Sequence, residues 1–234
     1  VRNLTQSPGA ADRFPAWSPD GQSIAYFSDA SGEYQLVIAD QKGAQKAVIA
    51  LENPTYYYSP VWSPDSQKIA FTDKALNLYY VEVSSQKVTR VDSDLFDHPL
   101  RSLDPAWSPD SAWLAYTRRL DNQLRAVFLY HLPDGTIHQV TDGMSDTTSA
   151  CFSRDGKYLF FTASANYGLN IGWLDMSSYD RPVQRSLYVA VLDKDEPSPL
   201  RPESDEETAS AGEEKPQDGA VDAKGKDGKP ATPP

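Results

Sequence analysis

One short motif recurs along the chain at a constant spacing, and it constrains the fold more than any other feature. An aromatic residue followed by Ser-Pro-Asp occurs three times, and a fourth, altered copy reads Phe-Ser-Arg-Asp-Gly. The aromatic residues are Trp17, Trp62, Trp107 and Phe152, so each step is 45 residues. A fixed period of this length is typical of repeat architectures such as β-propellers.

Each copy of the motif lies between two short apolar segments. Ser-Pro-Asp predicts a tight turn, because proline presets the backbone and aspartate can bond to its own backbone. A third apolar segment follows, and a shorter fourth segment closes the first three repeats. Four short strands per repeat are typical of a propeller blade. We therefore predict an all-β fold, a β-propeller of four-stranded antiparallel blades, with blades near residues 14–51, 59–92, 104–141 and 148–192.

The repeated aromatic residues and the two ends of the repeat region lead to further predictions. A blade cannot bury both of its apolar faces alone, so we expect the four aromatic residues to pack between neighbouring blades. Residues 1–5 resemble the outer strand of a blade, and no closing strand follows Val191. The two ends could pair and close a four-bladed ring. Alternatively, both could be open edges within a larger propeller.

Composition limits the class of partner. The 234 residues include 22 Lys and Arg against 33 Asp and Glu, which gives a net charge of −11. This charge argues against nucleic acid or an anionic membrane as a partner, since binding to phosphate needs a cationic surface. No apolar run approaches the length of a membrane span. The chain begins with Val, so we interpret it as a piece of a longer protein.

The last part of the chain differs in composition from the repeats. Residues 193–234 contain 12 Asp and Glu, 6 Lys and Arg, and no aromatic residue. Such a segment cannot bury enough apolar surface to offset its loss of conformational entropy. We predict a β-propeller region over residues 1–192 and an acidic, disordered linker or tail over 193–234.

The sequence has few residues that could take part in catalysis or bind a metal or cofactor. The sequence has three histidines, one cysteine and no Gly-x-Ser-x-Gly motif. It also has no paired Cys or His at zinc spacing and no Gly-rich phosphate loop. We predict no catalytic, metal-binding or cofactor-binding residue in this chain. We expect Cys151 to be a small core residue, since free cysteine is often buried.

Two groups of residues are candidates for binding a substrate or partner. Arg101, Arg118 and Arg125 cluster in the third repeat with Arg119, and they could bind peptide carboxylates through bidentate hydrogen bonds. Ion pairing with Asp104 and Asp121 is the alternative that we favour. Function concentrates on loops held by a rigid scaffold.

The second group lies in a long insertion of the fourth repeat, residues 166–182. It bears Tyr167 and Trp173, which could form a contact surface. The insertion could equally just cover the edge of the blade.

The repeat is similar to that of TolB-like propellers, of tricorn-type proteases and of relatives of prolyl oligopeptidase. Three longer segments narrow the resemblance to the propeller region of bacterial tricorn-like serine peptidases of the S41 type. They are residues 25–34, 98–107 and 172–182, and residues 194–200 ahead of the acidic segment fit as well. The resemblance covers about residues 1–207.

This resemblance implies a large serine peptidase that trims peptides, with propellers that admit and route polypeptide substrate. It also implies a PDZ module and a catalytic domain further along the parent chain, and a parent that could be a homo-oligomer. No catalytic motif of the family has a matching position in this sequence. The family suggests the cytoplasm, with the periplasm as an alternative. Two other hypotheses remain: a TolB-like module that binds a protein partner and has no peptidase domain, and a purely structural piece.

Overall fold

The computed structural model describes residues 1–96, 103–167, 170–171, 174–175 and 183–201. Contacts within the chain define a compact unit, Val1–Ser198, and a second unit, Pro199–Pro234. The first unit therefore extends beyond residue 192, where we placed the end of the propeller region. Lys157 Nζ pairs with Glu196 at 2.9 Å, which attaches the start of the acidic segment to the fourth blade. The remainder of the predicted tail, residues 202–234, lies outside the described residues.

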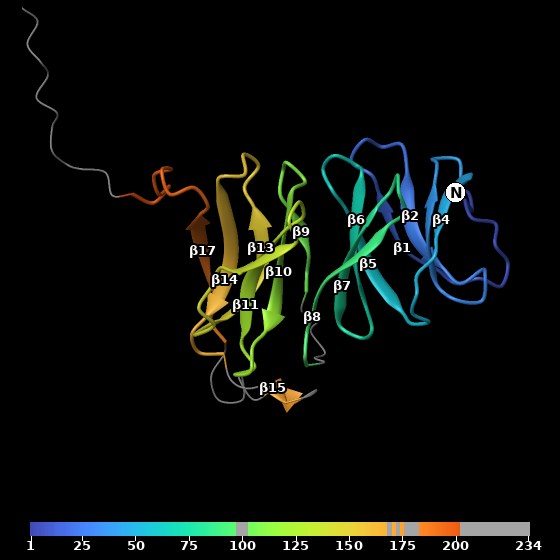
Figure 1. Ribbon diagram of the computed structural model, residues 1–234. Coiled ribbons are helices and arrows are strands. Elements are labelled where there is room, and N and C mark those ends of the chain that lie inside the picture. The colour runs from blue at the N-terminus through green and yellow to red at the C-terminus, as the bar shows by residue number, and fades with distance from the viewer. Residues whose placement is uncertain (97–102, 168–169, 172–173, 176–182, 202–234) are drawn as a thin grey trace, which may run out of the picture. The chain divides into compact units, whose positions relative to one another are not determined.

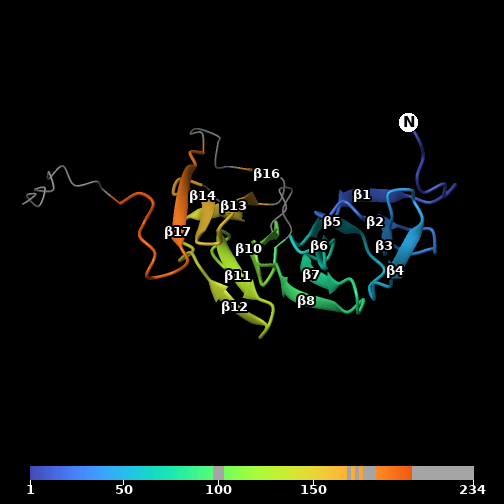
Figure 2. The same cartoon turned by 90° about the horizontal axis from the view of Figure 1, so that it is seen from above.

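Every regular element among the described residues is a β-strand, and neighbouring strands are antiparallel (Figures 1 and 2). The first blade consists of β1 (Asp12–Trp17), β2 (Ile24–Ser28), β3 (Gln35–Ala39) and β4 (Gln45–Ile49). The second consists of β5 (Tyr57–Trp62), β6 (Lys68–Asp73), β7 (Asn77–Glu82) and β8 (Val88–Ser93). The third consists of β9 (Ala106–Trp107), β10 (Trp113–Arg119), β11 (Arg125–His131) and β12 (Thr136–Gln139).

The fourth repeat forms a smaller sheet. Its three strands are β13 (Asp146–Phe152), β14 (Tyr158–Ser164) and β17 (Ser186–Val191). Between β14 and β17 a two-stranded ribbon is formed by β15 (Asn170–Ile171) and β16 (Leu174–Asp175). These sheets confirm the predicted all-β fold of propeller blades.

The Ser-Pro-Asp motif forms the predicted turn between the first two strands of each blade. In the first blade, Ser18 Oγ donates to Asp20 Oδ1 and accepts from the backbone N–H of Ser23 at 2.9 Å. The same serine–aspartate hydrogen bond recurs at Ser63, Ser108 and Ser153. The residue that follows the aspartate has a positive φ in each of the four turns. In chain order these residues are Gly21, Ser66, Ser111 and Gly156. We call the end of the sheets that carries these turns the turn end.

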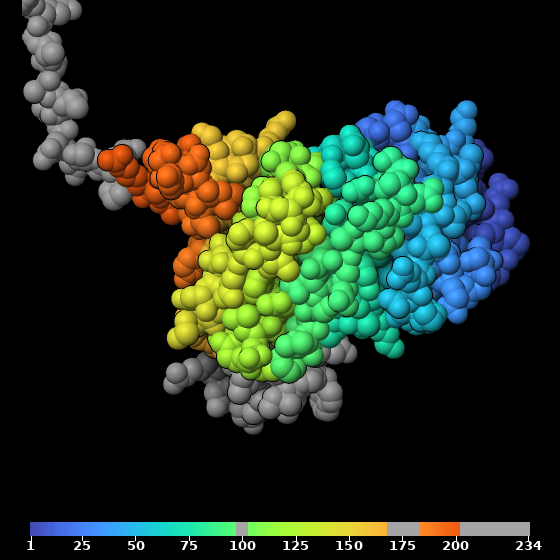
Figure 3. Space-filling view, in the orientation of Figure 1, coloured from blue at the N-terminus to red at the C-terminus, as the bar shows by residue number. Residues whose placement is uncertain are grey.

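Three apolar clusters lie between neighbouring blades, and a fourth lies on a face of the first blade. One cluster joins the first and second blades, another the second and third, and a third the third and fourth. Figure 3 shows the surfaces of the second and third blades in contact. The side chains of Trp62 and Trp107 are 7% and 8% exposed within the first two of these clusters. The prediction of inter-blade packing is confirmed for both. It is wrong for Trp17, which is 57% exposed, because no blade among the described residues covers this face of the first sheet.

The ends of the repeat region do not pair with each other. Residues 1–5 form no strand, and Leu4 packs on the first blade against Ile24, Tyr26 and their neighbours. The prediction of an outer strand that closes a four-bladed ring is therefore wrong, because this segment covers a face of the first blade instead.

The single cysteine also departs from its prediction. Ala150 is buried in the cluster that joins the third and fourth blades, whereas Cys151 is exposed. Successive residues of a strand point to opposite faces. Cys151 therefore lies on the face of the fourth sheet that meets no other blade among the described residues.

Candidate functional site

The described arginines of the predicted site lie at the end of the sheets opposite the turn end. Arg118 is near the end of β10, Arg125 begins β11, and Tyr167 follows β14. The short strand β15 lies at this same end (Figure 1). Arg101 and Trp173 lie outside the described residues. We call the charged groups at this end the charged cluster: Asp92, Asp94, Arg118, Arg119, Arg125, Asp146 and Arg185.

Arg125 forms a bidentate pair with a buried carboxylate of the next blade. Its Nε and Nη2 atoms donate to Asp146 Oδ1 at 2.9 Å and Oδ2 at 2.6 Å. Arg185 donates to the backbone oxygen of Asp146 at 2.9 Å and also to its carboxylate. Burial opposes the ionisation of Asp146, but the hydrogen bonds and charge of Arg125, together with Arg185, lower its pKa overall. Asp146 is therefore held as a carboxylate between two guanidinium groups.

Tyr167 lies against the two arginines that bind Asp146. The guanidinium carbons of Arg125 and Arg185 are 5.7 and 5.2 Å from the centre of its ring. These distances are in the range of cation–π contacts. The structure thus brings together two residues of the predicted site, Arg125 and Tyr167. It adds Asp146 and Arg185, which the sequence analysis missed because they are distant in sequence and belong to no motif.

The other arginines of the charged cluster connect the second and third blades. Arg118 Nη1 donates to both carboxylate oxygens of Asp92 at 3.0 Å. Its guanidinium carbon lies 4.4 Å from the centre of the Phe128 ring. The buried Arg119 lies 3.8 Å from Asp94, and burial lowers the pKa of its guanidinium. In both pairs the arginine belongs to β10 of the third blade. The aspartate belongs to the second blade, Asp92 in β8 and Asp94 directly after it.

Ion pairing is the interpretation that the geometry favours for the described arginines. Neither Asp104 nor Asp121 is a direct partner of these arginines, although the charge of Asp104 acts on Arg125. Among the described residues the arginines pair with Asp92, Asp94 and Asp146 instead. A guanidinium whose charge is already compensated by a carboxylate of a neighbouring blade gains less from binding a second carboxylate, and breaking the existing pair is costly. Arg118 and Arg125 therefore connect blades.

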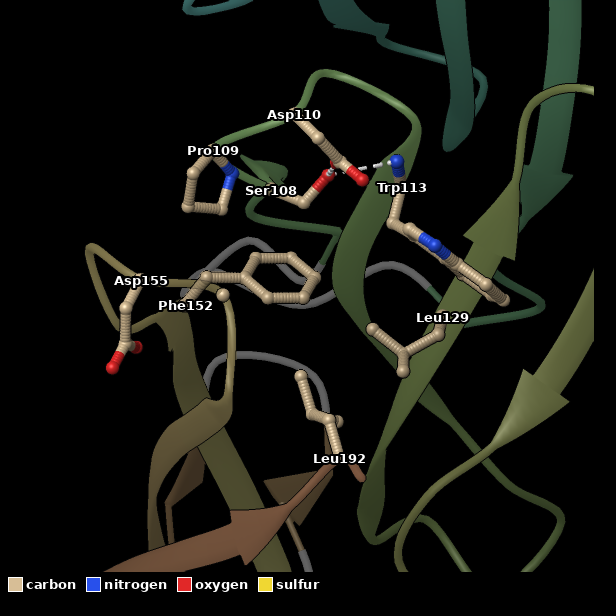
Figure 4. Close-up of a pocket in the computed structure, with 9 residues that line it drawn as sticks. Ser108, Pro109, Asp110, Trp113, Leu129, Phe152, Asp155 and Leu192 are labelled. Carbon is tan, nitrogen blue, oxygen red and sulfur yellow. Dashed lines mark hydrogen bonds between the residues drawn. The ribbon is translucent and has the colours of Figure 1, made fainter. Parts of the chain in front are cut away.

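A pocket opens at the turn end, between the third and fourth blades. It has a volume of about 350 Å³, and its lining includes Asp110, Trp113, Leu129, Phe152, Gly156 and Leu192. Figure 4 shows the Phe152 ring in the centre of this set, with Pro109 and Asp155 on one side and Trp113 and Leu129 on the other.

The pocket coincides with the altered copy of the motif. At the two preceding interfaces a tryptophan Nε1 donates to a backbone oxygen of the previous blade, from Trp62 to Ala16 at 3.1 Å and from Trp107 to Val61 at 3.0 Å. A serine of the turn also accepts from the backbone of the previous turn. Phe152 and Gly156 occupy these positions here, and neither side chain can form such a bond.

One exposed hairpin holds a hydroxyl, an imidazole and a carboxylate together. Thr136 Oγ1 donates to Asp134 Oδ1 at 2.7 Å and lies 3.2 Å from His138 Nε2. Since the hydroxyl proton is used by Asp134, the imidazole donates to the hydroxyl and does not act as its base. Hydrogen bonds from Thr136 and His131 lower the pKa of Asp134 to about 2. We interpret this group as a turn stabilised by its own side chains.

The described residues contain no group of three or more His, Cys, Asp or Glu that could hold a metal ion. The same part of the chain contains no helix with the length and hydropathy that a membrane span requires.

Comparison with known proteins identifies the family. A model of the tricorn protease second β-propeller domain matches residues 1–229. Among solved structures, the tricorn protease is similar with a TM-score of 0.63 and 16% identity, over 80% of this chain and 18% of that one. TolB from Acinetobacter baumannii has a TM-score of 0.51 and 20% identity, over 78% of this chain and 43% of TolB. An oligogalacturonate lyase from Vibrio parahaemolyticus has a TM-score of 0.56 and 12% identity, over 71% of this chain and 50% of the lyase.

At such identities the solved structures show a shared fold, and this chain spans half or less of the length of each of these three. A search of curated protein sequences found no match. The family model covers nearly the whole sequence, and the blades and turns that it implies are those described above. The chain belongs to the family of the tricorn protease second β-propeller domain.

Proposed function

We propose that this chain is the non-catalytic propeller portion of a tricorn-like serine peptidase, in which it docks or gates polypeptide substrate. The observation that supports the proposal is the family match over residues 1–229, to a propeller domain that takes its name from the tricorn protease. The similarity to the tricorn protease extends over only 18% of that protein, so most of such a parent would lie outside this chain.

The arrangement of charged groups supports a scaffolding and docking role rather than a catalytic one. The arginines of the charged cluster are compensated by carboxylates of neighbouring blades. These pairs hold the blades in place, and they leave loops, pockets and sheet edges as the surfaces that could contact a substrate. Tyr167 stays a candidate contact residue, because it is at the start of the insertion and lies against Arg125 and Arg185 of the charged cluster.

The family also defines the partners that we propose. They are peptides or unfolded polypeptides, together with a PDZ module and a catalytic domain of the same parent chain. We propose the cytoplasm as the compartment, with the periplasm as the alternative, and an oligomeric parent.

The test compares this chain with its parent protein. Both are purified and incubated with a fluorogenic tripeptide and with an unfolded protein of several hundred residues. The parent should hydrolyse both substrates, and a serine-directed inhibitor should abolish the activity. The 234-residue chain should hydrolyse neither, yet bind the unfolded protein. A parent without peptidase activity would contradict the proposal and would favour a TolB-like binding module.

A further inference from the structure

The pocket at the turn end, between the third and fourth blades, follows from the sizes of three side chains. Strand pairing and the 45-residue repeat show which positions of two neighbouring interfaces correspond. Between the second and third blades these positions hold Trp107, Tyr80 and Tyr130. Between the third and fourth blades they hold Phe152, Leu129 and Ala190. Each of these is smaller than its counterpart, and Leu129 and Phe152 line the cavity of about 350 Å³. The cavity is therefore a property of the packing at this interface.

The carboxylate that lines this pocket next to the third turn differs from that of the second turn in its partner. In the second turn, Lys68 Nζ donates to Asp65 Oδ2 at 2.9 Å. Trp113 takes the position of Lys68 in the third turn, because each begins the second strand of its blade. Asp110 uses its Oδ1 atom within the turn, and none of the described residues donates to its Oδ2 atom. This oxygen is therefore available to a donor from outside the chain.

The two remaining turns show that a lysine beside the aspartate is the rule. The charge of Lys46 acts on Asp20 in the first turn, and that of Lys157 acts on Asp155 in the fourth. Asp155 also lines the pocket, on the other side of the Phe152 ring (Figure 4). Since Asp155 already has a lysine near it, the carboxylate at the third turn is the one that would gain most from a bound cation.

The rest of the pocket wall suits a cation that carries an apolar group. Figure 4 shows the Asp110 carboxylate pointing away from Pro109 and towards Trp113. The Trp113 ring stacks on His131 with 4.2 Å between the ring centres, which holds the indole beside the cavity. Aromatic faces attract cations, and the apolar side chain of Leu129 suits an alkyl chain. The net charge of −11 also favours a cationic ligand.

We propose that this pocket binds a small organic cation with a primary ammonium group and an apolar stem. The ammonium donates to Asp110 Oδ2, as the lysine of the second turn donates to its own aspartate, and it lies beside the Trp113 ring. The stem fills the cavity against Leu129 and Phe152. This site goes beyond the proposed function, and it does not depend on the presence of a peptidase.

The experiment uses the 234-residue chain labelled with ¹⁵N, at pH 7, and hexylamine as the probe. The indole N–H signal of Trp113, assigned with Trp113→Phe, should shift as hexylamine is added. Hexanol, which has the same stem without the charge, should bind about fivefold more weakly, the effect of one exposed ion pair. Equal affinities for the two probes, or no shift of this signal, would overturn the proposal.

Asp110→Asn tests the carboxylate while keeping the turn, because asparagine retains an Oδ1 acceptor. It should lower the affinity for hexylamine about fivefold and leave the affinity for hexanol unchanged. Asp65→Asn, at the turn where Lys68 already provides the ammonium, is the matched control and should change neither affinity. Unchanged hexylamine binding by Asp110→Asn would contradict the assignment of this carboxylate.

Leu129→Tyr tests the cavity with the residue that the previous interface holds at Tyr80. The larger side chain should fill the cavity and abolish the binding of both probes, and thermal unfolding shows whether the variant is folded. If it is not folded, Phe152→Trp, which restores the residue of Trp107, makes the same test. Binding that persists in a folded variant would show that the cavity is not the site.

Two further measurements concern the source of the ligand and the longer protein. A lysine blocked at both ends presents the same ammonium on a protein-like side chain, and it should bind more weakly than hexylamine because its amides lose hydration in an apolar cavity. Tighter binding of the blocked lysine would overturn the assignment to a small molecule. Calorimetry on the parent protein should show the same loss with Asp110→Asn, and no loss would overturn the site there. Failure of the proposed function shows only in the peptidase assay, so the two are distinguishable.

Discussion

The interface between the second and third blades and the interface between the third and fourth blades derive from the same repeat, but different interactions stabilise them. At the turn end, the interface between the second and third blades has one hydrogen bond from the Trp107 indole and one to the Ser111 hydroxyl. At the other end it has the Arg118–Asp92 and Arg119–Asp94 ion pairs. The interface between the third and fourth blades lacks both of these hydrogen bonds at the turn end, and it has the bidentate Arg125–Asp146 pair. Where the motif has changed, the buried ion pair becomes the main polar connection between blades.

The largest effect should follow from removing Asp146. Asp146→Ala leaves Arg125 buried beside Arg185 without its carboxylate, which should lower the free energy of unfolding by about 3–5 kcal/mol. Urea denaturation followed by tryptophan fluorescence measures this. Asp134→Ala, at an exposed turn, is the matched control and should cost far less than Asp146→Ala. Equal losses in the two variants would refute the importance of the buried pair.

Acidification should weaken the same interface. The pKa of Asp146 is lowered in the folded state, so its contribution to stability is complete above the ordinary pKa of 3.8 and is lost as the pH falls through the lower, folded value. The difference in stability between the wild type and Asp146→Asn should therefore be constant above about pH 4 and shrink below it. A difference that stays constant down to pH 2 would argue against an ionised Asp146.

The loss of stability on replacing a tryptophan of the repeat should be larger where that tryptophan is more deeply buried. Trp107→Phe loses the bond to Val61 and part of the buried ring, so it should cost about 1–3 kcal/mol. Trp17→Phe removes an indole that is 57% exposed and should cost about 0.5 kcal/mol or less. Thermal unfolding of both variants compares them directly, and similar losses would contradict the assignment of Trp107 as an inter-blade residue.

The smallest effect should be a gain. Gly156→Ser introduces the hydroxyl that Ser66 and Ser111 provide at the earlier interfaces, where both serines adopt a φ of 59°. Gly156 has a φ of 75°, and a Cβ there would lie 3.8 Å from Pro109 Cδ, an ordinary contact. A bond to the backbone N–H of Asp110 should contribute about 0.5–1.5 kcal/mol, and the cost of a positive φ for serine offsets much of it, so we expect a net gain below about 0.5 kcal/mol. Destabilisation would show that the third interface is spaced differently from the other two.

Much of the fold could be predicted because the turn is a local structure. Ser, Pro and Asp bond within a few residues of one another, so the motif specifies a hairpin wherever it occurs. Burial of Trp62 also followed from the repeat. Exposure of Trp17 and Cys151 did not follow, because it depends on which blades stand beside these residues, and the repeat does not contain that information.

The candidate site was harder to predict for a related reason. Arg118 and Arg125 were recognised as a cluster by their closeness in sequence, but their carboxylates come from the preceding and following blades. Asp146 is 21 residues from Arg125, and no motif marks it. The nearby Asp104 acts on Arg125 through its charge alone, since strand register rather than sequence distance decides which charges form direct pairs.

The mass of the native gene product shows directly whether this chain is part of a larger peptidase. An antibody raised against residues 1–192 is used on a lysate of the source cell. We expect a band several-fold heavier than the 25.9 kDa of this chain, because the chain covers only 18% of the tricorn protease. A band near 26 kDa would contradict membership of a larger peptidase. It would leave a propeller that binds a partner on its own.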